Sequence, residues 1–245
     1  MARIFITGSA AGLGQFTGQS LISKGHEVVL HARNEARGKE ALNATPGAKA
    51  VLLADLCEPE ATKRLAAEVN GMGPFDVVIH NAGVYQAPAA QLLAVNTLAP
   101  YILTSLIKMP RRLIYLSSGM HLGGHANSSD IKNNINRISY SDTKLHVLML
   151  CKAVARKWPA VYANAVDPGW VPTKMGGAGA PDDLQKGFET QVWLADGKGK
   201  EANVSGKYFF HREEQSYHTG ADDLQLQEHF LEVCREVTGI SFPDR

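Results

Sequence analysis

A glycine-rich turn that follows a short apolar run is the feature that most restricts how this chain can fold. Residues 3–6 (RIFI) form an apolar strand pattern, and residues 7–14 (TGSAAGLG) follow at once. Residues 15–24 then show a helical pattern that Gly25 ends. Glycine lets the backbone turn sharply and approach a ligand closely, and a helix N-terminus offers unpaired N–H groups. This order of strand, turn and helix is typical of the first unit of a dinucleotide-binding fold.

Strand and helix patterns alternate along the rest of the chain. Strand patterns lie at residues 27–31, 50–54, 75–80, 112–116, 160–166 and 206–210, and helical patterns at 34–42, 91–108, 140–154 and 224–237. No linker, repeat or low-complexity segment divides the sequence. We therefore expect residues 1–245 to form a single α/β domain, a doubly wound Rossmann-type fold with helices on both faces. Its parallel sheet is expected to have about seven strands in the order 3-2-1-4-5-6-7.

Charge and cysteine usage argue against several kinds of site. The net charge is +1 and no stripe of Lys or Arg is present, so we do not expect nucleic-acid binding. Cys57, Cys151 and Cys234 are odd in number and far apart, which argues against disulfides and CxxC sites. His121 and His125 have an HxxxH spacing, but the intervening Leu-Gly-Gly does not suit a helical metal face. We expect no metal.

The position of the first strand in the sequence bears on where in the cell the protein is expected. It begins at residue 3, and no apolar run approaches the ~20 residues of a membrane span. We therefore expect no signal peptide and no membrane association, and we expect a cytoplasmic protein.

The end of the second strand bears on the choice of cofactor. In dinucleotide-binding folds a carboxylate here accepts hydrogen bonds from the ribose 2′-OH of NAD, whereas an arginine accommodates the 2′-phosphate of NADP. Ala32 stands at this position and Arg33 follows it. The sequence thus favours NADP(H), with NAD(H) as the alternative. Arg33 could also be an ordinary solvated surface residue.

A proline inside the helical pattern of residues 91–108 has a specific consequence. Pro100 lacks the N–H that would bond the carbonyl of Asn96, four residues before it. That carbonyl is expected to be free for another donor.

The strongest helical pattern begins at Tyr140. Tyr140 and Lys144 are four residues apart and so share one helix face. Ser117 and Ser118 follow the fifth strand. A serine at a strand end followed by Tyr-x-x-x-Lys, together with the Thr-Gly-x-x-x-Gly-x-Gly turn, resembles the short-chain dehydrogenase/reductase family. The interval of 22 residues from Ser118 to Tyr140 is similar to the retinol-dehydrogenase-like and carbonyl-reductase-like branches.

The resemblance, which covers nearly the whole chain, implies a set of site residues. The implied catalytic residues are Ser118, Tyr140, Lys144 and Asn96, whose main-chain carbonyl would hold a water in a proton relay. The implied cofactor-binding residues, with those from the turn, are Gly8, Ser9, Ala11, Gly12, Leu13, Gly14, Arg33, Asp55, Leu56, Asn81, Ala82, Gly83, Tyr140, Lys144, Pro168, Gly169, Val171 and Thr173. His80 departs from the asparagine found there in the family, and the segment between Asn81 and Asn96 is short for it. Asp55 could instead cap the next helix.

These residues imply hydride transfer between a nicotinamide and a small hydrophobic carbonyl compound or alcohol, with Tyr140 as acid or base. A free tyrosine has a pKa of ~10, and we expect Lys144 to lower that of Tyr140. Met120, His121 and Trp170 are expected to shape an apolar pocket beneath a mobile lid at residues 176–180.

Each of these side chains alone has an ordinary structural explanation, as a cap, a helix-start aromatic or a solvated lysine. A catalytically silent NADP(H)-binding sensor or scaffold protein on the same fold is the alternative.

The helix from Leu145 to Val154 is apolar almost all round, so it needs a second packing partner. In the resembled family this helix commonly lies in a subunit interface. We therefore expect a homodimer or homotetramer.

Overall fold

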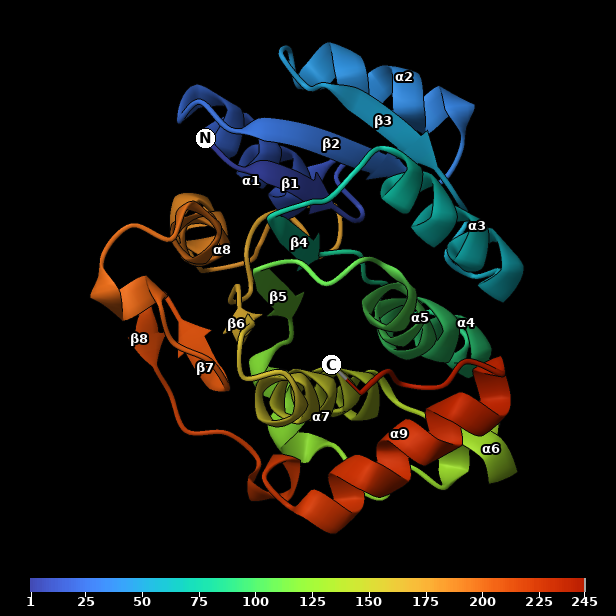
Figure 1. The fold of residues 1–245 in the computed structure, drawn as a ribbon. Coiled ribbons are helices and arrows are strands. Elements are labelled where there is room, and N and C mark those ends of the chain that lie inside the picture. The colour runs from blue at the N-terminus through green and yellow to red at the C-terminus, as the bar shows by residue number, and fades with distance from the viewer. Residues whose placement is uncertain (245) are drawn as a thin grey trace.

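The computed structural model describes residues 1–244, and they fold around a sheet of eight strands (Figure 1). The strands are β1 (Arg3–Ile6), β2 (Glu27–Ala32), β3 (Ala50–Leu53), β4 (Val77–His80), β5 (Arg112–Leu116), β6 (Tyr162–Asp167), β7 (Lys207–Phe210) and β8 (Glu213–Glu214). Their spatial order is β3-β2-β1-β4-β5-β6-β7-β8, and β1 to β7 pair in parallel. The predicted fold class and strand order are confirmed.

The eighth strand is a feature that the sequence does not predict. It pairs antiparallel with β7 through a tight turn at His211 and Arg212, whose φ angles of 50° and 68° are both positive. Such turns usually contain Asn or Gly. The pair His-Arg therefore gives no turn signal.

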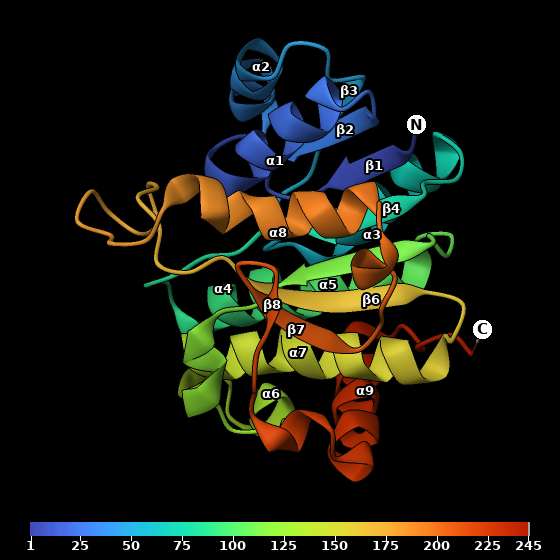
Figure 2. The same cartoon turned by 90° about the vertical axis from the view of Figure 1, so that its left-hand side faces the viewer.

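Helices cover both faces of the sheet, as Figures 1 and 2 show. Successive residues of β1 point to opposite faces, so Ile4 and Ile6 join one hydrophobic cluster and Phe5 joins the other. The first cluster is closed by α1 (Gly12–Ser23), α2 (Glu35–Ala44) and α8 (Leu184–Asp196). The second is closed by α3 (Pro59–Gly71), α5 (Ala99–Leu106), α7 (Tyr140–Lys157) and α9 (Leu224–Thr238). Of these, α8 has no counterpart among the helices expected from the sequence, and α3 was expected, without a range, only as the helix after Asp55.

The long helix expected at residues 91–108 is divided into three parts. It consists of α4 (Ala89–Leu93), a π-helical turn η1 (Ala94–Leu98) and α5. Pro100 is at the start of α5 and cannot supply an N–H to the preceding turn, which is the condition that favours a wider turn there. Asn96 lies within this π-helical turn.

The stretch Ala89–Leu106 is long and apolar enough to cross a membrane by length and composition, contrary to the expectation that no run approaches a span. Of this stretch, 72% is buried inside the fold, as in the core helix of a folded domain.

The second packing partner of α7 is α9 of the same chain. Residues from Asp142 to Val154 of α7 are almost all buried. The helix α9 crosses α7 on the side away from the sheet (Figure 1) and stacks Phe230 on His146 with 5.5 Å between ring centroids. The apolar face of α7 is therefore covered, at least in part, by α9 of the same chain, and the expected homo-oligomer stays a prediction.

Candidate active site

A cavity of about 380 Å³ lies at the carboxyl ends of the parallel strands. Loops that follow β1, β2, β3, β4, β5 and β6 all contribute to its walls. The predicted residues that line it are Gly8, Ala11, Gly12, Leu13, Arg33, Asp55, Leu56, Asn81, Ala82, Gly83, Tyr140, Lys144, Pro168 and Thr173. The fold thus brings most of the expected cofactor residues into one cavity, as expected for a site at the carboxyl edge of an open α/β sheet.

The glycine-rich turn is shaped by close contacts with the loop after β4. Gly8 has a φ of 62°, and a Cβ added to it would lie 2.7 Å from the Cα of Ala82. Asn81 Nδ2 donates to the carbonyls of Thr7 and Gly8 at 2.9 and 3.0 Å. At the start of α1 no side chain caps the helix. Its first N–H groups are therefore available to an anion such as a pyrophosphate.

Two expected cofactor residues of this turn do not line the cavity. The side chain of Ser9 is fully buried, and its hydroxyl donates to the carbonyl of Ile6 at 2.9 Å. Gly14 packs against the loop after β4, because an added Cβ would lie 2.4 Å from Asn81 Nδ2. Both residues hold the turn in shape.

Two arginines line the end of the cavity next to β2. Arg33 is exposed, and Arg37 is half-buried and donates to the carbonyl of Ala10 at 3.5 Å. Arg37 also forms an ion pair with Glu40. Sequence reasoning missed Arg37, although a second arginine in the first turns of the helix that follows Arg33 is a signal that could have identified it.

Asp55 lines the same end of the cavity and does not cap the next helix. Its Oδ1 accepts from the backbone N–H of Cys57 at 2.9 Å, whereas the N-cap of α3 is Glu58.

At the other end of the cavity, the first turn of α7 presents Tyr140 and Lys144. Ser139 and Asp142 form a capping box, which fixes where α7 begins. Lys144 Nζ donates to the carbonyl of Leu116 at 2.8 Å and lies 5.5 Å from the centroid of the Tyr140 ring. The predicted helix start and the shared helix face are both present.

The two serines after β5 have different partners. Ser117 Oγ donates to the backbone carbonyl of Lys144 at 2.8 Å and so fastens β5 to α7. Ser118 Oγ accepts from the backbone N–H of Met120 at 3.2 Å. Ser118 itself does not line the cavity, but its side chain lowers the pKa of the Tyr140 phenol, which does.

The pKa of Tyr140 is raised in this structure, contrary to the expected lowering. Burial is the main cause, the negative charge of Asp167 adds to it, and the hydrogen bond with Ser118 opposes it. Burial also lowers the pKa of Lys144 to about 8, against the opposing effect of Asp167. Lys144 is not among the groups that shift the pKa of Tyr140, and its ammonium donates to the Leu116 carbonyl.

The Asn96 side chain links two segments near the site by hydrogen bonds. Its Oδ1 accepts from the N–H of Val84 at 2.8 Å, and its Nδ2 donates to the Val84 carbonyl at 3.0 Å. The same Nδ2 donates to Thr143 Oγ1 at 3.1 Å, which connects the loop after β4 to α7. The resemblance assigned a role only to the main-chain carbonyl of Asn96, which does not line the cavity.

The three residues expected to form the substrate pocket do not line the cavity. Met120 and Trp170 are 47% and 60% exposed. His121 is buried, and its Nδ1 donates to the Ser118 carbonyl at 2.7 Å while its Nε2 accepts from the N–H of His218 at 3.2 Å. With both nitrogens paired, His121 has no free atom to offer a substrate.

Tyr85 makes an aromatic contact with Tyr140 that the sequence did not indicate. It lies in the short loop after β4 and is 40% exposed. Its ring meets the Tyr140 ring edge-on, with 4.8 Å between centroids.

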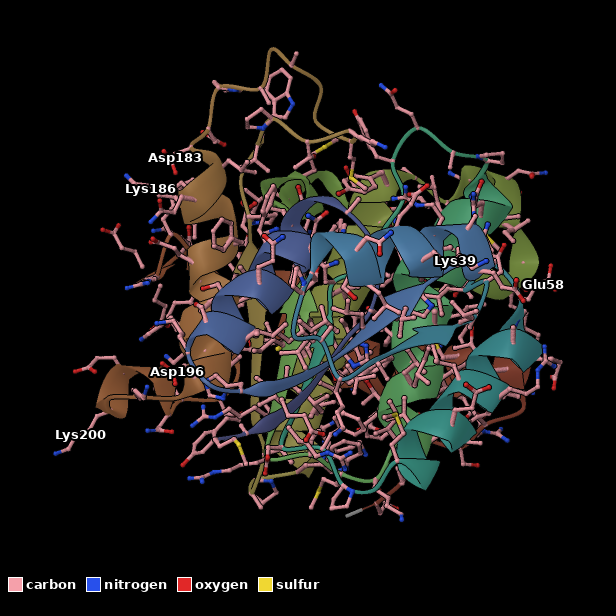
Figure 3. The ribbon with its side chains drawn as sticks, turned by 90° about the horizontal axis from the view of Figure 1, so that it is seen from above. Lys39, Glu58, Asp183, Lys186, Asp196 and Lys200 are labelled. Carbon is pink, nitrogen blue, oxygen red and sulfur yellow. The ribbon has the colours of Figure 1, made fainter. Side chains whose placement is uncertain are left out.

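The segment between β6 and α8 projects beyond the body of the protein (Figures 2 and 3), next to the labelled Asp183 at the start of α8. Pro168 and Thr173 of this segment line the cavity, whereas Gly169 and Val171 do not. Lys174 and Met175, which the sequence did not single out, line it as well.

The remaining expectations concern His80 and metals. His80 is buried, shares a hydrogen bond with Thr104 at 3.2 Å and stacks on Tyr115, so it packs in the core behind the cavity.

Among residues 1–244 there is no group of three or more His, Cys, Asp or Glu side chains that could hold a metal ion.

Comparisons with known proteins agree with this geometry. The family model for short chain dehydrogenase matches residues 2–183. An uncharacterized oxidoreductase of Emericella nidulans is 46% identical over 99% of this chain and 99% of its own length. A putative uncharacterized protein of Mycobacterium paratuberculosis has a similar structure, with a TM-score of 0.84, 23% identity, and coverage of 99% and 95%. A metagenomic blue fluorescent protein in complex with NADPH has a TM-score of 0.71, 19% identity, and coverage of 85% and 95%.

Proposed function

The chain belongs to the short-chain dehydrogenase family of oxidoreductases, and we propose that it uses NADP(H) to interconvert a carbonyl compound and an alcohol. One observation carries the proposal: the cavity is lined at one end by the glycine-rich turn and Arg33, and at the other by Tyr140 and Lys144. The α1 N-terminus would hold the pyrophosphate, and Lys144 would hold the nicotinamide ribose.

The preference for NADP(H) is supported by charge at one end of the cavity. Ala32 leaves no carboxylate at the end of β2, and Arg33 and Arg37 both line the cavity there. A 2′-phosphate forms strong charge-assisted hydrogen bonds with guanidinium groups. The NADPH bound to a structural neighbour is in keeping with this choice.

The chemistry of the chain depends on the proton of Tyr140. When bound, the nicotinamide supplies or accepts the hydride. Because the pKa of Tyr140 is raised, its hydroxyl is protonated at neutral pH and can act as the acid that protonates the carbonyl oxygen during reduction. Ser118, whose side chain acts on the pKa of this hydroxyl, would donate a hydrogen bond to the same oxygen. The buried Lys144 would add positive charge nearby.

A hydrophobic substrate is supported by three large exposed side chains. Tyr85, Met120 and Trp170 are exposed on the loops that follow β4, β5 and β6. None of the three lines the cavity, but Tyr85 contacts the ring of Tyr140, which does. Exposed apolar groups beside a site favour an apolar ligand.

The proposal is tested by following substrate-dependent oxidation of NADPH with a panel of hydrophobic ketones and aldehydes. Turnover is expected for the natural chain. Tight NADPH binding without turnover of any carbonyl compound would instead favour a sensor or scaffold protein, the alternative that the sequence left open. Absence of NADPH binding would contradict both functions.

A further inference from the structure

We propose that His31 is a positioning residue of the cofactor cavity, whose neutral imidazole ties the glycine-rich turn to the end of β3 and thereby sets the walls that hold the adenosine half of the dinucleotide. This inference rests on the proposed function. It gives a role to a side chain that the sequence marks only as part of a strand.

The imidazole of His31 makes two hydrogen bonds that fix its tautomer. Nδ1 accepts from the backbone N–H of Gly8 at 2.9 Å, and Nε2 bonds the carbonyl of Ala54 at 3.0 Å. A carbonyl only accepts, so Nε2 has to carry the ring proton and Nδ1 the lone pair. The ring is 3% exposed, and burial lowers its pKa to about 4, which agrees with a neutral imidazole.

The backbone of His31 adds two further hydrogen bonds to the same turn. Its N–H donates to Ser9 Oγ at 2.9 Å, and its carbonyl accepts from the N–H of Ser9 at 3.1 Å. On the opposite side, Asn81 Nδ2 donates to the Gly8 carbonyl at 3.0 Å. Gly8 is therefore held through its N–H by β2 and through its carbonyl by the loop after β4.

His31, Gly8 and Ala54 all line the cavity, and Ala54 directly precedes Asp55. Replacing the imidazole by an apolar group leaves the N–H of Gly8 and the carbonyl of Ala54 without their partner, so the two walls can shift apart. Tyr140 and Lys144 lie at the other end and do not touch His31. A variant of His31 should therefore weaken binding of the adenosine half and leave the chemical step intact.

The experiment measures binding of adenosine 2′,5′-bisphosphate, which carries only the adenosine half of NADP, to the full chain by calorimetry. His31→Leu is expected to raise its Kd about tenfold, equivalent to ~1.4 kcal/mol. The kcat at saturating NADPH should stay within about twofold, because the catalytic side chains are unchanged. His31→Asn keeps an acceptor near the Nδ1 position for Gly8 and should have an intermediate Kd.

His80→Leu is the matched control. His80 is likewise a buried histidine at the end of a strand of the same sheet, β4, but it does not line the cavity. This variant should lower the Tm and leave the Kd of adenosine 2′,5′-bisphosphate unchanged.

The outcomes separate this inference from the proposed function. If His31→Leu lowers the Tm as His80→Leu does but binds the bisphosphate as the natural chain does, His31 has only a structural role and the inference is wrong. If the Leu variant does not fold, an unchanged Kd in His31→Asn overturns it. If the natural chain binds neither NADPH nor the bisphosphate, both the inference and the proposed function are wrong.

Discussion

At the scale of single residues, the proposed chemistry depends on Tyr140 and Lys144, which are one helical turn apart. Tyr140 is proposed to donate the proton, and Lys144 is proposed to hold the nicotinamide ribose. Burial keeps the Tyr140 phenol protonated, while the Lys144 ammonium is held by the Leu116 carbonyl. We therefore expect the lysine to act mainly by holding the nicotinamide ribose and less through the pKa of the phenol.

Tyr140→Phe removes one hydroxyl and leaves the packing of α7 unchanged. The kcat for carbonyl reduction should fall by about 10²- to 10⁴-fold, the usual contribution of a general acid, while the Kd of NADPH should hardly change. Lys144→Ala should lower kcat and raise the Kd of NADPH as well. Steady-state kinetics and fluorescence titration with NADPH measure the two effects. Near-normal reduction by Tyr140→Phe would show that another group is the acid.

Arg33, which follows β2, and Arg37 of α2 are expected to select NADPH. Arg33→Ala or Arg37→Ala should weaken NADPH binding by ~1–3 kcal/mol and leave NADH binding nearly unchanged, because only NADPH carries the 2′-phosphate. Lys39→Ala is the control: Lys39 is an exposed cation of the same helix α2 (Figure 3) and does not line the cavity. Equal affinity of the natural chain for NADH and NADPH would contradict the assignment.

At the scale of elements, α9 determines how α7 is buried. Phe230 of α9 is fully buried and stacks on His146 of α7. Phe230→Ala should lower the free energy of unfolding by ~3–5 kcal/mol, the range for deleting a buried aromatic ring.

Urea denaturation measures this effect. Leu224→Ala, at an exposed position of the same helix, should change stability by only about 0.5 kcal/mol. A similarly small effect of Phe230→Ala would mean that α9 does not cover α7 in solution, and a subunit interface would again have to be considered.

At the scale of the whole molecule, buried histidines should make stability depend on pH. Burial lowers the pKa of His121 and also those of three other buried histidines. Burial lowers the pKa of His31 and His146 to about 4 and that of His80 to about 3. In the unfolded chain the same groups have a pKa near ~6.5. Between these values the unfolded state binds more protons, so stability is fully present above pH ~6.5 and falls as the pH is lowered toward 4.

Each histidine contributes a slope of ~1.4 kcal/mol per pH unit, so the three together give up to about 4 kcal/mol per pH unit. Urea denaturation at pH 7 and pH 5 measures this change. Equal stability at the two values would mean that the histidines are protonated, or hydrated, in the folded state.

The sequence alone determined the fold class and most of the cofactor cavity. Strand patterns, the glycine-rich turn and the Tyr140 to Lys144 spacing are local features, since they depend on backbone conformation and on helix periodicity. They indicate a Rossmann-type fold, and the strand order and the lining of the cavity by Gly12, Arg33 and Tyr140 agree with that fold.

Only the tertiary structure decided which distant groups meet. It paired His31 with Gly8, closed α9 over α7, placed Tyr85 against Tyr140 and paired both nitrogens of His121. It also raised the pKa of Tyr140, because the extent of burial depends on everything packed around the ring. The physical reason is the same in each case. Hydrogen bonds, ring contacts and desolvation act between residues that are near in space, and the sequence does not indicate which residues far apart along the chain come near one another.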